Sequence, residues 1–362
     1  MFFDIINMYI YVRKAARKTR RIFEGLIGND SLKKKLFSDL SSESLSHAYI
    51  IEGKRGSGRH TVAKMTAAAL SCVNRENSSM PLPCGECLNC RKILADNSPD
   101  VITIGIEEKK ASIGVEAARF LRSDIRVIPN DLDYKVYIIE DADTMTPQAQ
   151  NALLLSLEEP PSFVKFFLLC EDAGAMLETI RSRAQILRTE PIEAADIDKY
   201  VVSHYPEALR MKQSDPKMFG ELIMSAQNSI GEAISLLEPK NFKKLSDMRA
   251  VAREFTEAVV KGIDSEKAAI LISKFEIKRD SLSLQLENVL LSLRDLIALS
   301  KSETAPLLFY YDRDEALALC DSVSIKMLVK AYDEVDKTLK VLSANANARL
   351  SLLKLFSDTG IL

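Results

Sequence analysis

The stretch of sequence that decides the fold is GKRGSGRHT, residues 53–61. It follows the apolar run AYII, residues 48–51, and opens a segment with a helical pattern. Between a strand and a helix, a glycine-rich loop can hold phosphate groups with the backbone N–H groups of the helix N-terminus. The sequence therefore predicts a phosphate-binding loop, with five candidate nucleotide-site residues: Gly53, Gly56, Gly58, Arg59 and Thr61.

The loop departs from the complete phosphate-binding motif, which has lysine and then serine or threonine after the last glycine. Here Arg59 and His60 take those positions. A planar guanidinium does not replace the compact ammonium between the phosphates, and imidazole is a poor ligand for Mg²⁺. Thr61 could supply the hydroxyl only if the loop shifted by one residue. We expect the loop shape without the catalytic chemistry, which leaves open an empty site, weak binding of ATP or ADP, and turnover.

A pair of acids supports the same fold. The apolar run KVYII, residues 135–139, is followed by Glu140 and Asp141. A hydrolysing enzyme has Asp and then Glu at this point, to hold Mg²⁺ and to orient water. The order is reversed here, and Asp141 is one methylene shorter than the usual water-orienting residue. Both acids join the degenerate nucleotide site.

Four of the six cysteines, Cys72, Cys84, Cys87 and Cys90, follow the pattern C-x11-C-x2-C-x2-C. Four thiolates at this spacing predict a closed tetrahedral zinc site with a structural role. An iron–sulfur cluster uses the same ligands and stays open as an alternative, while four unrelated thiols fit the regular spacing poorly. Cys170 and Cys320 lie in apolar surroundings typical of core residues.

The order of the apolar and helical segments predicts an α/β domain followed by helices. Continuous apolar runs, including FFLLC at residues 166–170, suit strands of a parallel sheet with helices on both faces. One helix should begin at Pro147, after Thr146 as its N-cap, and end before Pro160. Strand signals fade after Pro191. The predicted division is an extension at 1–21, the α/β domain at 22–190, a small helical domain at 191–241 and a larger one at 242–362.

Composition excludes several classes of protein. The chain of 362 residues has a formal net charge of −2, which argues against a protein that coats nucleic acid through its overall charge. It contains no run of about 18 apolar residues, so we expect no membrane span. At the N-terminus the apolar stretch precedes the basic run, the reverse of a secretory signal. These features predict a cytoplasmic protein.

A phosphate-binding loop followed soon by C-x2-C-x2-C resembles the gamma/tau and delta-prime family of bacterial DNA polymerase III clamp-loader subunits. The supporting stretches are FEGLIG (23–28), HAY (47–49), NALL (151–154), LEEPP (157–161) and IRSR (180–183). The resemblance implies an AAA+ domain, a helical lid and a helical collar that joins the subunits into an open ring. The implied partners are gamma/tau and delta subunits and, through the assembly, the sliding clamp and primed DNA.

The resemblance also implies a role for Arg183. The family's Ser-Arg-Cys motif supplies an arginine finger to the ATP site of the neighbouring subunit, and this chain has Ser182, Arg183 and Ala184 there. A guanidinium presented in trans can stabilise the transferring phosphoryl group. The competing interpretation is an ordinary surface arginine near a helix end.

Other family positions have changed. Leu155 stands in place of a lysine, and Gly231 aligns with an arginine that senses the γ-phosphate. Groups for turnover in cis are lost while the group that acts in trans remains. This favours the non-hydrolysing role within the family. A divergent gamma/tau-type ATPase that uses Arg59 and Thr61 is the alternative, and a zinc-dependent DNA-binding module is a third possibility.

Overall fold

The chain forms two compact units in the computed structural model, which describes residues 21–42, 44–107 and 110–361. The first unit comprises the described residues up to Asp196 together with Ser229–Gly231. The second comprises Ile197–Asn228 and the residues from Glu232 onwards. The predicted extension at 1–21 lies outside the described residues except for Arg21. The predicted three-domain boundaries stay a prediction.

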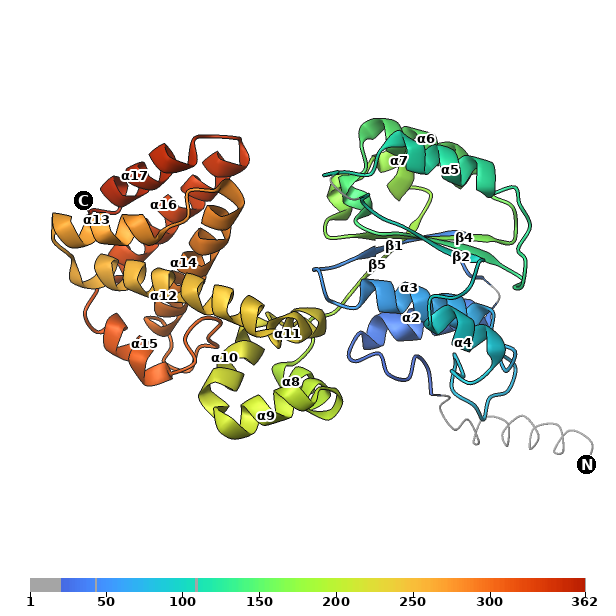
Figure 1. The fold of residues 1–362 in the computed structure, drawn as a ribbon, viewed down its shortest axis with the longest axis horizontal. Coiled ribbons are helices and arrows are strands. Elements are labelled where there is room, and N and C mark those ends of the chain that lie inside the picture. The colour runs from blue at the N-terminus through green and yellow to red at the C-terminus, as the bar shows by residue number, and fades with distance from the viewer. Residues whose placement is uncertain (1–20, 43, 108–109, 362) are drawn as a thin grey trace, which may run out of the picture. The chain divides into compact units, whose positions relative to one another are not determined.

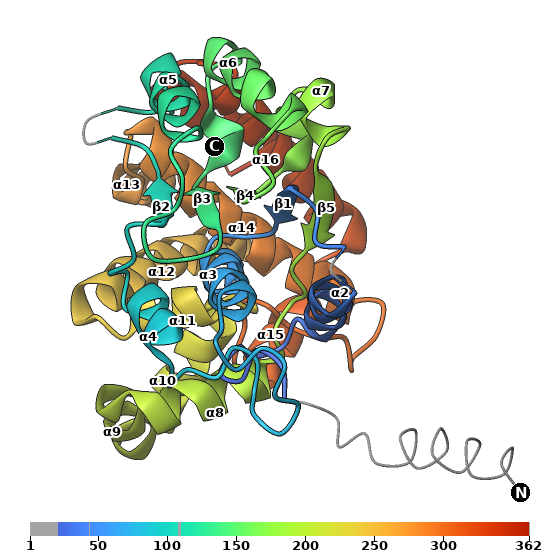
Figure 2. The same cartoon turned by 90° about the vertical axis from the view of Figure 1, so that its right-hand side faces the viewer.

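The first unit is built on a parallel sheet of β1 (Ala48–Glu52), β2 (Val101–Ile104), β3 (Lys135–Ile139), β4 (Val164–Cys170) and β5 (Gln185–Arg188). The strand order is β2-β3-β4-β1-β5, and every neighbouring pair is parallel. The labels run across Figure 2 in this order. The three apolar runs quoted above became the central strands β1, β3 and β4, which are almost wholly buried.

Helices cover both faces of this sheet (Figure 1), which confirms the predicted α/β class. One face carries α2 (Asp30–Ser41), α3 (Arg59–Leu70) and α4 (Leu88–Leu94), and the other carries α5 (Val115–Asp124), α6 (Pro147–Glu158) and α7 (Glu178–Arg181). Short 3₁₀ turns, η1 (Ala142–Thr144) and η2 (Ala173–Ala175), follow β3 and β4. Thr146 caps α6 as predicted, its hydroxyl accepting the Ala149 N–H at 3.2 Å.

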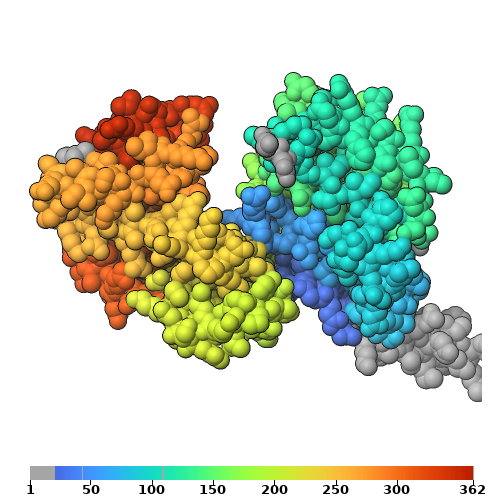
Figure 3. All heavy atoms as spheres, viewed as in Figure 1, coloured from blue at the N-terminus to red at the C-terminus, as the bar shows by residue number. Residues whose placement is uncertain are grey.

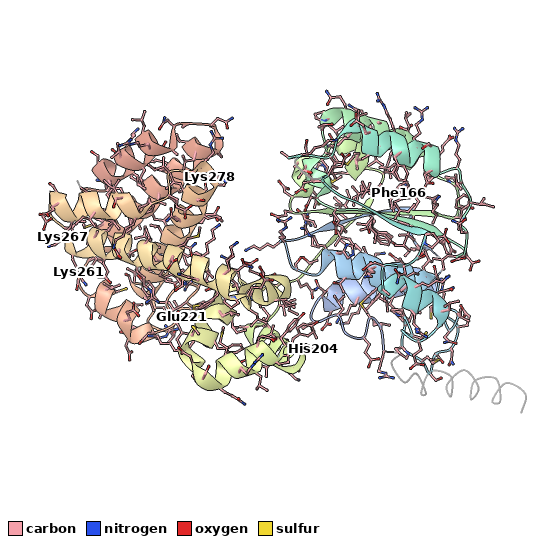
Figure 4. All side chains as sticks on the ribbon, in the orientation of Figure 1. Phe166, His204, Glu221, Lys261, Lys267 and Lys278 are labelled. Atoms are coloured by element: carbon pink, nitrogen blue, oxygen red, sulfur yellow. The ribbon has the colours of Figure 1, made fainter. Side chains whose placement is uncertain are left out.

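Alternating side chains of β4 supply both cores of the sandwich, as the strand period of two requires. Phe166, labelled in Figure 4, stacks on Tyr137 with ring centroids 5.4 Å apart and packs with residues of α5 and α6. Phe167 stacks on Tyr49 at 5.7 Å and packs with residues of α2 and α3. The carboxyl ends of β1, β3 and β4 therefore meet at one edge of a rigid, doubly covered sheet.

The second unit is helical throughout its described residues. Two of its helices, α8 (Ala194–His204) and α11 (Ile230–Leu236), begin in residues of the first unit. The others are α9 (Pro206–Ser214), α10 (Pro216–Ser225), α12 (Pro239–Lys261), α13 (Ser265–Lys274), α14 (Arg279–Leu299), α15 (Arg313–Cys320), α16 (Ile325–Ser343) and α17 (Ala348–Asp358). Helix α14 packs against α12, α15 and α16 around a shared core. Among the described residues, no helix combines the length and the apolar character that crossing a bilayer requires.

Candidate functional site

The predicted phosphate-binding loop lies between β1 and α3. Gly56 and Gly58 have φ of 75° and 91°, left-handed conformations that favour glycine. Gly58 is the N-cap of α3 and provides no side-chain cap, so the first N–H groups of this helix have no partner within it. Gly53 is required by space, because a Cβ there would lie 1.8 Å from Thr189 Oγ1. The local geometry of an anion-binding loop is therefore present.

Arg59 places its guanidinium between this loop and the end of β3. Its side chain is only 8% exposed, and Nη2 lies 3.8 Å from Asp141 Oδ1. Nη1 is buried and has no hydrogen-bond partner. Thr61, two residues further along α3, is exposed. Arg59 is thus the buried cationic group of the loop, and its Nη1 donates no hydrogen bond to the protein.

A second pair lies beside it. His60 Nδ1 is 2.8 Å from Glu140 Oε1. The contact with His60 lowers the pKa of Glu140, against a smaller opposing effect of burial, and the charges of Arg55 and Arg59 add to the lowering. Arg55 Nη2 lies 3.6 Å from Asp141 Oδ2. The structure therefore brings Arg59 and both predicted acids into one cluster, whereas Thr61 lies exposed on α3.

Arg55 and His60 also belong to this cluster, although neither was among the predicted site residues. Their position in the glycine-rich run was the sequence signal for this role. The loop follows β1 and the acids follow β3, and only β4 lies between these two strands in the sheet. Within this cluster, Arg59 and the N-terminus of α3 could bind the phosphates of a nucleotide. It does not fit Mg²⁺ equally well, because an imidazole replaces the hydroxyl ligand.

The four clustered cysteines converge as predicted. Their Sγ atoms all lie within 4.8 Å of one another, and those of Cys84 and Cys90 are 3.9 Å apart. A tetrahedral zinc ion with Zn–S bonds of about 2.3 Å would separate its sulfurs by about 3.8 Å. Cys84 Sγ also accepts the Cys87 N–H at 3.4 Å, and Cys87 Sγ accepts the Cys90 N–H at 3.5 Å. This cluster could hold a metal ion with four sulfur ligands.

The electrostatics of the cluster favour one thiolate. Burial raises the pKa of Cys84, but the Cys87 N–H and the Asn74 amide outweigh it and bring the pKa to about 6. Burial raises the pKa of Cys72 and of Cys90. In Figure 3 the surrounding segment, coloured between blue and cyan, forms part of the outer surface of the first unit, although three of the four thiols are buried. Cys170 and Cys320 are not part of the cluster.

Arg183 lies just after α7 and is held by its own chain. Its Nη2 is 3.0 Å from Glu158 Oε1 at the end of α6, and its Nη1 donates to the Thr179 carbonyl at 2.9 Å. The side chain is 36% exposed, so the guanidinium is both oriented and accessible. Glu158 lies in the LEEPP stretch, but its contact with Arg183 could not be predicted, because the two residues are 25 positions apart in the sequence.

Two further family positions can be placed. Leu155 is 54% exposed on α6. Gly231 belongs to the first unit, where its N–H donates to the Gly56 carbonyl at 3.1 Å. A Cβ at position 231 would lie 2.6 Å from Gly56 Cα, so a larger residue has no room beside the loop.

A glycine-rich loop with anion-binding geometry on a parallel sheet of order β2-β3-β4-β1-β5, followed by a helical C-terminal part, fits the AAA+ class of proteins. Residues 28–193 match the family described as "DNA polymerase III, delta subunit". The chain is 31% identical over 313 residues to DNA polymerase III subunit gamma of Buchnera aphidicola subsp. Acyrthosiphon pisum, covering 81% of this chain and 82% of the relative. The chain belongs to the gamma/tau and delta-prime family of DNA polymerase III clamp-loader subunits.

Relatives of more than one type appear within this family. The tau subunit of Bacillus subtilis is 36% identical over 163 residues, which cover 45% of this chain and 28% of that protein. The delta-prime subunit of the same organism is 31% identical over 212 residues, which cover 58% of this chain and 59% of that protein. Overall similarity therefore leaves the type of subunit open, and the residues of the site have to decide it.

Proposed function

We propose that this chain is the non-hydrolysing, delta-prime-type subunit of the clamp loader and supplies Arg183 as an arginine finger to the ATP site of a neighbouring subunit. Its assembly would join gamma/tau and delta subunits and place a sliding clamp on primed DNA during replication. We assign the chain no ATP turnover of its own, and the cysteine cluster would hold a structural zinc ion.

The observation that carries the proposal is the contrast between two arginines. Arg183 is accessible and oriented by Glu158 and by the Thr179 carbonyl, as a group that acts on a neighbour requires. Arg59 is buried in the loop, where its fork-shaped guanidinium replaces lysine. The groups that would position Mg²⁺ and attacking water in cis are replaced by the His60–Glu140 pair and the short Asp141.

Single-turnover ATP hydrolysis in a reconstituted loader tests the finger. An arginine finger contributes about 10³–10⁵ in rate at the site it serves, so Arg183→Ala should slow one ATP site by that order. Assembly, measured by sedimentation, should be unchanged, because an exposed ion pair contributes only about 0–1 kcal/mol.

Arg210→Ala is the matched control, because Arg210 is also an exposed arginine paired with a glutamate, Glu207, at 3.1 Å. Hydrolysis in this variant should equal that of the unaltered chain. Equal hydrolysis by the Arg183→Ala loader would remove the finger assignment.

A divergent gamma/tau-type ATPase is the second candidate, and the gamma and tau relatives favour it. It requires turnover by the chain alone, with Asp141 serving the metal or the attacking water. The two candidates therefore differ in an observable property of the isolated chain.

A further inference from the structure

The Arg59 guanidinium is a buried charge that the protein satisfies incompletely. Nη1 has no hydrogen-bond partner, and the Asp141 oxygen at 3.8 Å from Nη2 is beyond hydrogen-bonding distance. A buried guanidinium without acceptors is costly, so buried charges are usually paired. The unused donor indicates that an anion from outside the chain completes this site.

The position of the guanidinium defines where such an anion would bind. Arg59 is the first residue of α3, a helix of 12 residues whose N-cap, Gly58, has no side chain. The free N–H groups and the positive end of the helix dipole favour a phosphate at this point. Nη2 of Arg59 lies 3.8 Å from Asp141, which follows the carboxyl end of β3. The guanidinium therefore lies where the helix N-terminus faces the carboxyl edge of the sheet.

His60 and Glu140 occupy the place where Mg²⁺ would be held. In a complete motif, the hydroxyl residue at position 60 would bind the metal opposite the acids that follow β3. Here the imidazole Nδ1 and the carboxylate Oε1 contact each other directly at 2.8 Å. Mg²⁺ prefers oxygen ligands and near-ideal octahedral geometry, which this contact does not offer. The positive charge near the phosphates has to come from side chains.

We propose that this loop binds the phosphate chain of a nucleoside di- or triphosphate without a divalent cation. Arg59 contacts the phosphate directly, and Arg55 supplies further positive charge beside Asp141, while the His60 ring occupies Glu140. The proposal assigns a ligand to the chain's own loop. It does not depend on Arg183, so it and the trans role can fail separately.

Equilibrium binding of ADP and ATP to the full chain, measured by calorimetry in excess Mg²⁺ and in EDTA, tests the proposal. The two values of Kd should agree within about twofold for each nucleotide. Inorganic pyrophosphate should compete, because the phosphates provide the contacts. Absence of saturable binding, a requirement for Mg²⁺, or failure of pyrophosphate to compete would each overturn it.

Substitutions separate the charge from the shape of the loop. Arg59→Met keeps a long apolar stem and removes the charge, so Kd should rise by about tenfold or more. Arg210→Met on the exposed face of α9 should leave Kd unchanged. The double substitution Arg59→Lys with His60→Thr restores the metal-binding motif, and its affinity should become dependent on Mg²⁺. Metal-independent binding by this double variant, or undiminished binding by Arg59→Met, would show that Arg59 and His60 do not define the site.

Discussion

Two buried aspartates hold loops in place, one in each unit. Asp100 is fully buried and accepts the backbone N–H groups of Asn130, Asp131 and Leu132 at 2.7–3.0 Å. Asp295 on α14 is also fully buried and accepts the N–H groups of residues 308–310. Each carboxylate thus accepts hydrogen bonds from the backbone N–H groups of one connecting segment. In the sequence both residues look like solvated acids, because the backbone N–H groups that they accept lie 13 or more residues away.

Asp295→Ala should therefore destabilise the second unit. The substitution leaves at least two buried N–H groups without acceptors, at about 1–3 kcal/mol each. We expect a loss of about 3 kcal/mol in the free energy of unfolding, measured by urea titration with helical circular dichroism. Asp333→Ala on the exposed face of α16 is the control and should stay within about 0.5 kcal/mol of the unaltered protein. Equal midpoints for the two variants would contradict this role.

At the scale of elements, the sequence predicted the strands that are buried on both faces. β1, β3 and β4 are continuous apolar runs, and they form the middle of the sheet. The edge strands β2 and β5 were not recognised, because most of their residues are only half-buried and their patterns are mixed. The contact between His60 and Glu140 could not be predicted either. This contact depends on where the first turn of α3 lies relative to the end of β3, and the local sequence does not determine that position.

The cysteine cluster is the element whose pattern predicted its geometry most directly. Cys72 follows α3, while Cys90 lies in α4, so a bound ion would join these two helices. We expect about one equivalent of zinc in the purified protein and a fall in the free energy of unfolding of the first unit when a chelator removes it. Cys90→Ser should lower the zinc content, whereas Cys320→Ser, outside the cluster, should leave it unchanged. Elemental analysis that finds iron, or no metal, would contradict the assignment.

At the scale of the whole molecule, overall sequence similarity does not distinguish a gamma/tau-type ATPase from a non-hydrolysing subunit. Gamma, tau and delta-prime relatives all match this chain at about 30% identity, so the degree of identity does not select one type of subunit. We expect turnover by the chain itself to depend on a few side chains around Gly58. Steady-state ATP hydrolysis by the chain alone measures their combined effect.

We expect no turnover by the isolated chain, because His60 already pairs with Glu140 and Asp141 lies against Arg55 and Arg59. These contacts engage the acids that would otherwise hold metal and orient water. Asp141→Asn should therefore leave the rate at the background level, and adding a hydrolysis-competent gamma-type partner should produce turnover that depends on Arg183. Saturable turnover by the chain alone that Asp141→Asn abolishes would instead identify a divergent motor, in which Arg59 replaces the usual lysine.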